Sequence, residues 1–371
     1  MINKKLNIAL FSPNENPYSE TFIQAHKNYL DGNVFYYFGT GIGIRLEKHK
    51  AMMGYYTNLL LKIYAKITKK SSSYIWKKRI LHSLKFNNID VVLVEYGTHA
   101  HHLREVLRRS GLPVVVHFHG YDASVRSVLS DCGNYKEVFQ LSQKVIAVSY
   151  VMKDKLLSIG CPSKKIVVNR CGPQPEFEEV IPLFSKKQFL SVGRFTDKKA
   201  PYYTILAFKD VLREYPNAQL LLAGDGALFN SCLNLIKYYG IENNIKMLGV
   251  IKPEEFRDLL KESIALVQHS ITSLSGDMEG TPVAVLEASI AGLPVISTIH
   301  AGIPEVIIHG ETGLLSKEHD VDTMTSHMKL ILSDVESAKK LGAAGKLNVS
   351  EHFNLKKHIN LLQLTLENAK K

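Results

Sequence analysis

The sequence has few cysteines and no long apolar run. Its four cysteines lack C-x-x-C or zinc-type spacing, so neither a disulfide framework nor a structural metal is indicated, and a reducing cytoplasm is the default compartment. No stretch approaches the roughly 18 to 20 apolar residues that span a bilayer. The first apolar run, Leu6–Phe11, is too short for a signal peptide and is followed by Pro13, so it predicts a β-strand. The cysteines are Cys132, Cys161, Cys171 and Cys232.

Acidic residues are also in deficit. The chain carries 46 Lys and Arg against 35 Asp and Glu, which gives a formal net charge of +11 and a pI of about 9.2. This excess predicts an anionic partner, and phosphates, phospholipid headgroups and nucleic acid all satisfy it. No helix-turn-helix, zinc-finger or RNA-binding signature accompanies the charge, so nucleic acid is not expected as a partner. A basic nucleic-acid-binding protein is kept only as an alternative of a different class.

The 371 residues are 45% apolar and 22% charged, as in an ordinary globular protein, and their number fits two domains. Short β-branched runs alternate with longer amphipathic stretches, which is typical of parallel sheets covered by helices. The segment Cys171–Ser185 contains three prolines and predicts a stiff connection. A last helix is expected through His358–Leu366. Strands are expected at Leu6–Phe11, Val34–Phe38, Val91–Val94, Val114–His117, Val145–Val148 and Ile166–Val168, then at Phe189–Val192, Leu220–Ala223, Ile245–Leu248, Ile264–Gln268 and Val295–Ser297.

The densest motif is EGTPVAVLEA at residues 279–288. Pro282 suits the first turn of a helix and Gly292 suits its end. A helix that starts near Thr281 directs unpaired N–H groups and a partial positive charge toward the preceding loop, which makes a phosphate site. Glu279 precedes this helix and Glu287 lies inside it, so the two carboxylates are expected to have different roles.

A second element of the phosphate-binding type lies upstream. Gly193 and Arg194 follow an expected strand, and Lys198 and Lys199 precede a helix. Arginine offers a planar fork to phosphate oxygens, and lysine offers a compact charge. Taken alone, these cations are better explained by a solvated loop.

Four further motifs accompany these two elements: LAGDG at residues 222–226, LG at 248–249, AGIPE at 301–305 and GETGLL at 310–315. Together they resemble the retaining glycosyltransferases of family 4. The resemblance implies an α/β fold of the GT-B type, with two facing Rossmann-like doubly wound domains and the active site in the interdomain cleft. The expected domains are an acceptor-binding domain over residues 1–175, a nucleotide-sugar donor-binding domain over residues 176–350, and a C-terminal helix over residues 351–371 whose leucines suit packing on the first domain.

The resemblance also implies a role for each matched residue. Arg194 and Lys199 are implied to neutralise the leaving diphosphate, and Glu279 to lie beside the transferred sugar. Glu287 is implied to accept hydrogen bonds from the ribose hydroxyls. Backbone N–H groups at the helix start are implied to hold the distal phosphate. The other matched donor-binding positions are Gly193, Gly226, Gly280, Thr281, Pro282 and Val283.

In the first half of the chain, the best match is HFHGYD at residues 117–122, at the end of an expected strand. His119 resembles the family histidine that faces the sugar, and a purely structural role is its alternative. Strand alternation places His117 and His119 on one face. No third ligand is evident, so no metal site is predicted. The run THAHH at residues 98–102 predicts a helix start with solvated imidazoles.

Three segments depart from the family pattern or imitate another one. Many members have a glycine-rich loop after the first strand, whereas this chain has NENPYSETF at residues 14–22. Its SETF run resembles a variant among exopolysaccharide and colanic-acid-type enzymes, which leaves the contacts of this loop with the donor open. GTGIG at residues 39–43 predicts a turn and not a dinucleotide site. The DVD run at residues 320–322 imitates a metal motif, but its place before a helix predicts capping.

The predicted function is metal-independent transfer of a sugar from a nucleoside-diphosphate sugar, with UDP or GDP as the nucleotide, to a saccharide or lipid-linked acceptor in polysaccharide biosynthesis. The donor is a substrate, and no cofactor is expected. A sugar-nucleotide 2-epimerase of the same fold and an inactive scaffold are alternatives. The Glu279 motif argues against the epimerase, and the intact cations and glutamates argue against the scaffold.

The segment of residues 45–79 is strongly basic, with ten Lys and Arg residues, a single acid, Glu47, and interleaved apolar and aromatic residues. This pattern suits a helix that lies on an anionic membrane, which would make a cytoplasmic protein peripheral to the inner face of the membrane. An amphipathic helix that packs on its own domain with a solvated lysine face has the same pattern. The sequence leaves both interpretations open.

Overall fold

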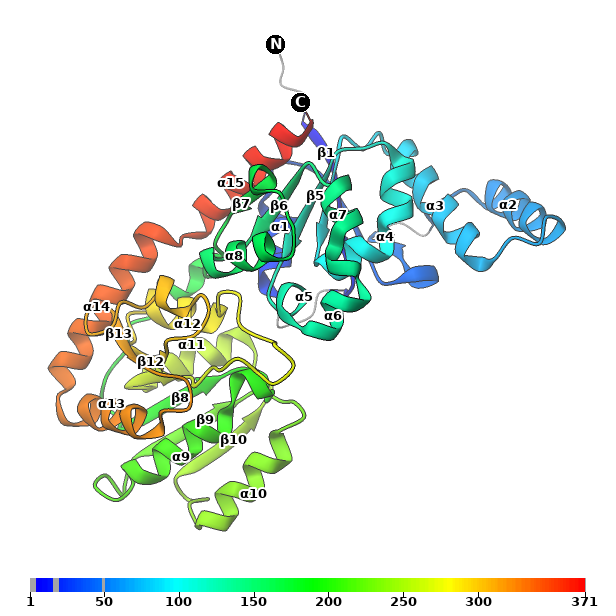
Figure 1. Cartoon of the computed structure of the whole chain (residues 1–371). Helices are drawn as coiled ribbons and strands as arrows, with labels where there is room; N and C mark the ends of the chain where they lie inside the picture. Colours follow the sequence, from blue (N-terminus) through cyan, green and yellow to red (C-terminus); the bar gives the residue numbers. More distant parts are fainter. Residues whose placement is uncertain (1–4, 16–19, 49–50, 371) are drawn as a thin grey trace. The chain divides into compact units, whose positions relative to one another are not determined.

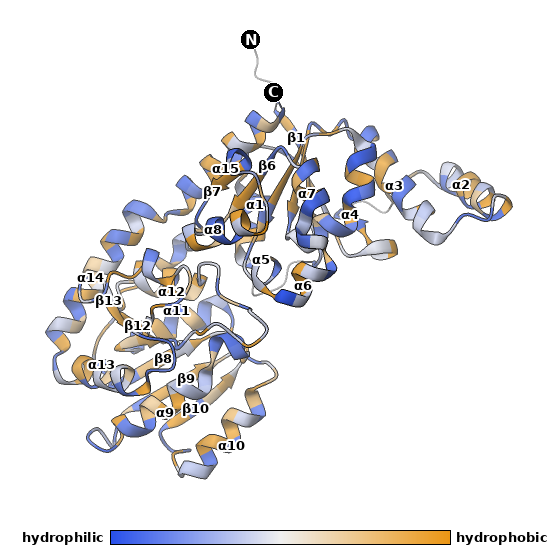
Figure 2. Ribbon diagram, viewed as in Figure 1, coloured by the Kyte–Doolittle hydropathy of each residue, from blue (hydrophilic) through white to orange (hydrophobic). Residues whose placement is uncertain are grey.

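The computed structural model describes residues 5–15, 20–48 and 51–370. The chain divides into two compact units, one formed by Met1–Asn169 with His358–Lys371 and the other by Arg170–Lys357. Each unit has a parallel β-sheet covered by helices (Figure 1). The strands carry apolar residues, and polar residues gather on the outer faces of most helices (Figure 2). Within the described ranges, no helix combines the length and apolarity needed to cross a membrane.

The sheet of the first unit has seven strands among its described residues, in the order β3-β2-β1-β4-β5-β6-β7. Its central strands have the sequences VVLVE and VVVHF and are buried throughout, as expected where helices cover both faces of a sheet. All neighbours are parallel except the edge pair β2 and β3. The bounds are β1 (Leu6–Ser12), β2 (Gly32–Phe38), β3 (Arg45–Leu46), β4 (Val91–Glu95), β5 (Val114–Phe118), β6 (Lys144–Ala147) and β7 (Ile166–Val168).

In the first unit, helix α4 begins at Gly97, close to the helix start predicted near Thr98. The expectation of solvated imidazoles is wrong for His99, which is buried at 3% exposure and lies 6.4 Å from the Phe11 ring. The bounds are α1 (Thr21–Tyr29), α2 (Tyr55–Ile67), α3 (Ser72–Phe86), α4 (Gly97–Ser110), α5 (Tyr121–Ser124), α6 (Arg126–Asp131), α7 (Lys136–Leu141), α8 (Tyr150–Ser158) and, from His358 onward, α15 (Leu355–Lys370).

The sheet of the second unit has six parallel strands among its described residues, in the order β10-β9-β8-β11-β12-β13. Counted from its own first strand, this is the 3-2-1-4-5-6 order of a doubly wound Rossmann sheet. The strand order therefore reverses between β8 and β11. The bounds are β8 (Gln188–Val192), β9 (Gln219–Ala223), β10 (Ile245–Gly249), β11 (Ala265–Val267), β12 (Val295–Thr298) and β13 (Gly313–Ser316).

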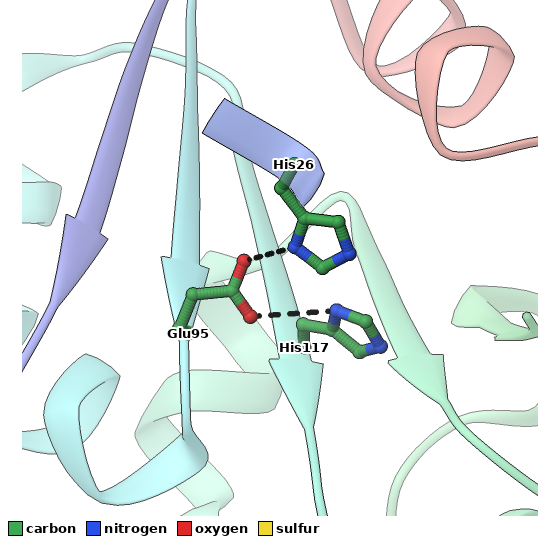
Figure 3. A group of neighbouring side chains, drawn as sticks. All are labelled: His26, Glu95 and His117. Atoms are coloured by element: carbon green, nitrogen blue, oxygen red, sulfur yellow. Dashed lines mark hydrogen bonds and ion pairs between the residues drawn. The ribbon is translucent and has the colours of Figure 1, made fainter. Parts of the chain in front are cut away.

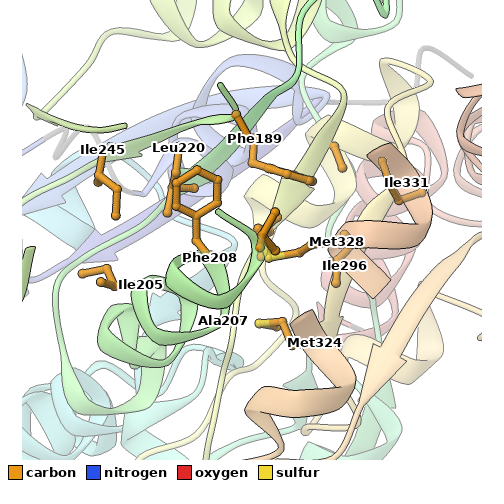
Figure 4. Close-up of a cluster of buried hydrophobic side chains, with 14 of the residues drawn as sticks. Phe189, Ile205, Ala207, Phe208, Leu220, Ile245, Ile296, Met324, Met328 and Ile331 are labelled. Carbon is orange, nitrogen blue, oxygen red and sulfur yellow. The ribbon is translucent and has the colours of Figure 1, made fainter. Parts of the chain in front are cut away.

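The helices of the second unit pack on this sheet around a cluster of buried apolar side chains (Figure 4). The rings of Phe189 and Phe208 meet edge to face at 6.2 Å in this cluster. Asp320 accepts a hydrogen bond from the Thr323 N–H and caps α13, which confirms the capping prediction. The bounds are α9 (Pro201–Val211), α10 (Phe229–Tyr239), α11 (Pro253–Glu262), α12 (Val283–Ile290), α13 (Val321–Ser333) and α14 (Val335–His352).

Truncating a central ring of this cluster should be costly. Phe208 is fully buried, so Phe208→Ala should lower the free energy of unfolding by about 3 to 5 kcal/mol through lost burial and the cavity left behind. The control Tyr238→Ala, at a position that is 81% exposed, should change it by less than about 0.5 kcal/mol. Urea unfolding followed by circular dichroism measures both. Equal small losses would contradict the assigned core.

Candidate active site

Two loops leave the carboxyl ends of neighbouring strands in the second unit. The loop after β8 carries Gly193 to Lys199, and the loop after β11 carries Gln268 to Pro282. Strands β8 and β11 are paired, and the strand order reverses between them. In doubly wound sheets, ligands bind outside the carboxyl ends of the strands at this reversal. The topology therefore brings both predicted phosphate elements to the position where such a sheet binds its ligand.

The loop after β8 is held against the loop after β9 by the main chain. The Gly193 N–H donates to the Ala223 carbonyl at 3.0 Å. A Cβ atom at Gly224 would lie 2.0 Å from the Gly193 carbonyl oxygen, and its φ of +133° also favours glycine. Gly226, with a φ of +152°, leaves only 2.6 Å between an added Cβ and the Phe195 carbonyl oxygen. Gly226 is thus needed for the close approach of these two loops.

Lys199 and Glu279 form a buried ion pair. Their Nζ and Oε1 atoms are 2.9 Å apart, and the lysine also donates to the Gln268 Oε1 at 3.1 Å. Gln268 donates in turn to the Ser270 hydroxyl, which contacts Glu279 at 3.4 Å. Burial alone would raise the pKa of Glu279, but the charges of Lys199 and Lys198 outweigh it and lower the pKa to about 2. Glu279 is therefore a carboxylate at neutral pH.

The segment around Glu279 is fixed at two further points. Lys198 pairs with Asp277 at 3.0 Å, so the two adjacent lysines hold the same loop. The Glu279 N–H donates to Nε2 of His300 at 3.1 Å, which leaves Nδ1 of His300 as the donor to Glu318 at 2.6 Å. Glu318 also accepts the N–H of Thr272 at 2.9 Å. These contacts position the main chain of Glu279 as well as its side chain.

Arg194 and Glu287 contrast with the Lys199 pair because neither has a charged partner among the described residues. Arg194 is exposed and lines a small pocket of about 10 Å³ with Gly193, Lys199 and Gln268. Glu287 is buried in α12 at 7% exposure, and this burial raises its pKa to about 8. The two glutamates of the motif thus lie in opposite electrostatic environments.

The helix of the EGTPVAVLEA motif starts slightly later than predicted. A start near Thr281 with Pro282 in the first turn was predicted. Helix α12 instead begins at Val283, and Pro282 is its N-cap with extended backbone (φ −67°, ψ 116°). The Pro282 carbonyl accepts the N–H groups of Val285 and Leu286. The N–H groups of Val283 and Ala284 have no acceptor within the described part of the chain. Two unpaired amide donors therefore stand at the positive end of α12.

The remaining predicted site residue, His119, lies in the first unit. Its Nε2 is 2.7 Å from Oε2 of Glu95, and its side chain is 6% exposed. The expectation that His117 lacks neighbouring ligands is wrong. His26, Glu95 and His117 place potential ligand atoms within 4.8 Å of one another (Figure 3). Of the predicted residues, the structure thus joins Lys199 with Glu279 directly and gives His119 a carboxylate partner that was not predicted.

Several residues of these networks escaped sequence analysis. They share no local spacing with the residues that they hold, because each comes from the end of a different strand or from a distant helix. The strand-end position of a polar residue was the one available signal, and it applies to Glu95 and Gln268. The missed residues are His26, Glu95, Gln268, Ser270, Asp277, His300, Glu318 and His358.

The two units and this site define a two-domain α/β protein of the GT-B type. Family comparisons match the description "Glycosyl transferases group 1" to residues 174–348 and "Glycosyltransferase Family 4" to residues 47–177. The chain thus contains domains that match both of these glycosyltransferase families.

The relatives include proteins of bacterial exopolysaccharide synthesis by name. The amylovoran biosynthesis glycosyltransferase AmsK of Erwinia amylovora is 34% identical over 244 residues, which cover 64% of this chain and 60% of AmsK. WcaL of Escherichia coli K12, whose assignment to colanic acid biosynthesis is provisional, is 31% identical over 57% of this chain and 53% of WcaL. The chain thus spans little more than half of these relatives.

Among solved structures, Anabaena HepE in complex with UDP-glucose superposes with a TM-score of 0.77 at 15% identity, over 98% of this chain and 100% of HepE. This likeness establishes the fold. It agrees with the predicted GT-B class and with the doubly wound sheets described above.

Glu287 should give the protein a measurable pH dependence. Because its folded pKa of about 8 exceeds the ordinary 4.5, the folded state keeps a proton between these values that the unfolded chain releases. The free energy of unfolding should therefore fall as pH rises through this range, by at most about 1.4 kcal/mol per pH unit. Urea titrations from pH 5 to pH 8 should show this slope reduced in Glu287→Gln and retained in the exposed control Glu311→Gln. An unchanged slope in Glu287→Gln would disprove the assignment.

Proposed function

We propose that this protein is a retaining glycosyltransferase that moves a sugar from a nucleoside-diphosphate sugar to a hydroxyl of a saccharide or lipid-linked saccharide in polysaccharide biosynthesis. The observation that carries the proposal is the meeting of two cation-bearing loops and an uncapped helix start at the strand-order reversal of the second unit. The complex of HepE with UDP-glucose and the assignment of AmsK to amylovoran biosynthesis support the same class of donor and pathway.

The diphosphate is the group that this site suits best. Breaking the bond between the sugar and the diphosphate leaves negative charge on the diphosphate, and preorganised donors stabilise that charge. Arg194 supplies an exposed guanidinium without a charged partner among the described residues, and α12 supplies the N–H groups of Val283 and Ala284. These groups carry out the neutralisation that a divalent ion would otherwise supply, so we propose transfer without a metal. The nucleotide is UDP or GDP.

Lys199 has a more specific place in this proposal. Its charge is already balanced by Glu279 at 2.9 Å, so it adds less net positive potential than Arg194 does. The pair instead keeps Glu279 ionised beside the transferred sugar, where positive charge develops at the anomeric carbon. His119 of the first unit contacts the sugar in this proposal, as the family resemblance implies.

Glu287 is proposed to bind the ribose hydroxyls. A buried carboxyl group with a pKa of about 8 lacks hydrogen-bond donors, and two hydroxyl groups of a ribose would supply them. Nucleotide binding would then stabilise the ionised form. This accounts for the buried Glu287 carboxyl group in the motif, although its burial lowers the stability of the nucleotide-free protein above pH 4.5.

A lipid-linked acceptor is supported by the surface of α2. Only Ala65 of this helix is buried, while seven of its large apolar or aromatic side chains are at least 42% exposed. Figure 2 shows apolar residues on the outward surface of α2. In contrast, α3 buries Ile80 and Leu84 and packs on its own unit. The exposed side chains of α2 are Tyr55, Tyr56, Leu59, Leu60, Ile63, Tyr64 and Ile67.

Charge favours an anionic bilayer as the partner of α2. Lys62, Lys66, Lys69 and Lys70 are all exposed beside the apolar residues. Lysines interleaved with apolar side chains suit the headgroup layer, and each contributes about 1 kcal/mol near anionic lipid. Beside α2 and α3 lies a pocket of about 650 Å³ whose lining includes Arg45, Lys48, Arg79, Met52 and Met53. Glu15 and Glu47 also line this pocket, so its three cations exceed its acids by one.

Arg194 should be needed for turnover and not for folding, because it is exposed and forms no ion pair that its loss would strand. Arg194→Ala should lower kcat by about 10² to 10³, the scale for removing one electrostatic stabiliser. Arg213→Ala, at an exposed arginine paired only with Asp210, is the matched control. Turnover is measured with labelled UDP- and GDP-sugars, with and without lipid-linked acceptor, in EDTA. Wild-type turnover by Arg194→Ala would refute the diphosphate assignment, and so would activity that requires added metal. Epimerisation of the sugar nucleotide without acceptor would indicate the 2-epimerase.

The α2 surface should bind vesicles that contain anionic lipid. Co-sedimentation should be strong at low salt, weak at high salt and absent with neutral vesicles. Changing Lys62, Lys66, Lys69 and Lys70 to glutamine should abolish binding. Changing the exposed lysines Lys237, Lys246, Lys339 and Lys340 of the second unit should leave it intact. If the protein fails to bind anionic vesicles and instead forms a dimer that the α2 changes disrupt, the exposed face is a protein interface.

A further inference from the structure

A group of buried polar side chains lies at the carboxyl ends of β4 and β5 in the first unit. Glu95 ends β4, directly opposite His117 in the register of β5, and His26 approaches from α1 (Figure 3). Glu95, His117 and His26 are fully buried. His119 follows β5, and His358 of α15 lies behind His26. A carboxylate and four imidazoles in so little water need a hydrogen-bond arrangement that satisfies them.

The contacts form a chain from the main chain of α15 to His119. The Asn169 amide nitrogen donates to the His358 carbonyl at 3.1 Å, and Nδ1 of His358 is 3.1 Å from the Asn169 Oδ1. Nε2 of His358 lies 2.7 Å from Nε2 of His26, whose Nδ1 is 2.7 Å from Oε1 of Glu95. Oε2 of Glu95 lies 2.7 Å from Nε2 of His119.

The direction of these hydrogen bonds follows from the His358 carbonyl at one end of the chain, which can only accept. The His358 carbonyl receives the Asn169 amide N–H, so Oδ1 of Asn169 faces the His358 ring and accepts its Nδ1–H. With neutral rings, His26 must then donate through Nε2, which leaves two lone pairs facing each other between His26 and Glu95. One extra proton removes this conflict, whether it lies on an imidazole or on Oε1. In every case Oε2 of Glu95 accepts.

Distances favour a proton over a metal ion between these groups. Two ligands of a tetrahedral zinc, each about 2.0 to 2.1 Å from the ion, are about 3.3 Å apart. The separations from Glu95 to His26 and from Glu95 to His119 are both 2.7 Å, which is the length of a charge-assisted N–H···O bond, and only the separation from Glu95 to His117, 3.4 Å, is near the zinc value. Burial alone would raise the pKa of Glu95, but the neighbouring imidazoles of His26, His117 and His119 hold the pKa well below its ordinary value.

We propose that Glu95 is a positioning residue that fixes His119 with its Nε2–H toward the carboxylate, so that Nδ1 is the ring atom available to a sugar hydroxyl. The inference rests on the proposed function for its use and on the hydrogen-bond chain for its geometry. Other contacts restrain the same ring: Phe22 stacks on it at 4.3 Å, and Tyr96 lies 4.7 Å away. Oδ1 of Asp122 accepts the His119 N–H at 3.0 Å and fixes the main chain.

The chain makes an unusual prediction for the isosteric amide. In Glu95→Gln, the amide nitrogen can donate to the lone pair of His26 while the amide oxygen accepts from His119. Every hydrogen bond of the chain is then kept without the extra proton that the carboxylate requires. Glu95→Gln should therefore retain kcat within a few-fold. Glu95→Leu removes the acceptor and should lower kcat by about 10- to 100-fold, the cost of losing an orienting partner of a histidine. Donor affinity, measured by nucleotide binding, should be unchanged in both variants, and a wild-type-like circular dichroism spectrum and unfolding transition show that the first unit of each remains folded.

Nitrogen-15 NMR of the wild-type imidazoles tests the geometry without reference to activity. The His119 signal, assigned by its loss in His119→Phe, should show the Nε2–H tautomer in the wild type and in Glu95→Gln, and should lose this signature in Glu95→Leu. An Nδ1–H tautomer, or a stoichiometric zinc in the purified protein that depends on His117, would overturn the proposal. So would equal loss of kcat in Glu95→Gln and Glu95→Leu. If the wild type turns over no sugar nucleotide, the proposed function fails, while the NMR result still decides the role of Glu95.

Discussion

Each sheet of this protein gathers ionisable side chains at the carboxyl ends of its strands, where burial makes an unpaired charge costly. The surrounding structure is arranged to meet that cost. Glu279 has Lys199, and Glu95 has a set of imidazoles. Asp122 receives the N–H groups of Gly97, His119 and Gly120. These partners come from different strands and helices, so satisfying the charges also fixes the loops that carry them.

The groups without partners are therefore the informative ones. In the second unit, Arg194, Glu287 and the first amides of α12 lack charged or hydrogen-bonding partners among the described residues, whereas the nearby Lys199 and Glu279 are paired with each other. A cation, two N–H donors and a carboxyl group in need of donors are complementary to a diphosphate joined to a ribose. The site is thus rigid where it must hold its own charges and open where a ligand would complete it.

Much of this fold was predictable because strands buried on both faces have continuous β-branched runs such as VVLVE, which can be recognised from sequence. The strands β3 and β13 were missed because they are short and β3 has only two residues. The Lys199 and Glu279 elements were recognisable as local motifs. The bond between His26 and His358 joins residues 332 positions apart, and no local pattern encodes it. The exposure of α2 was also undecided, because amphipathic spacing is the same whether a helix packs on its own domain or on a membrane.

Hydrogen exchange at the backbone amides of Val283 and Ala284 tests the central claim most directly, because these two amides are proposed to bind the diphosphate. In the free protein, Val283 and Ala284 should exchange quickly, since no acceptor among the described residues protects their N–H groups. Saturating UDP or GDP should slow their exchange strongly and leave α10 unchanged. Unaltered exchange at Val283 and Ala284 while the nucleotide is demonstrably bound would place the diphosphate elsewhere and contradict the account.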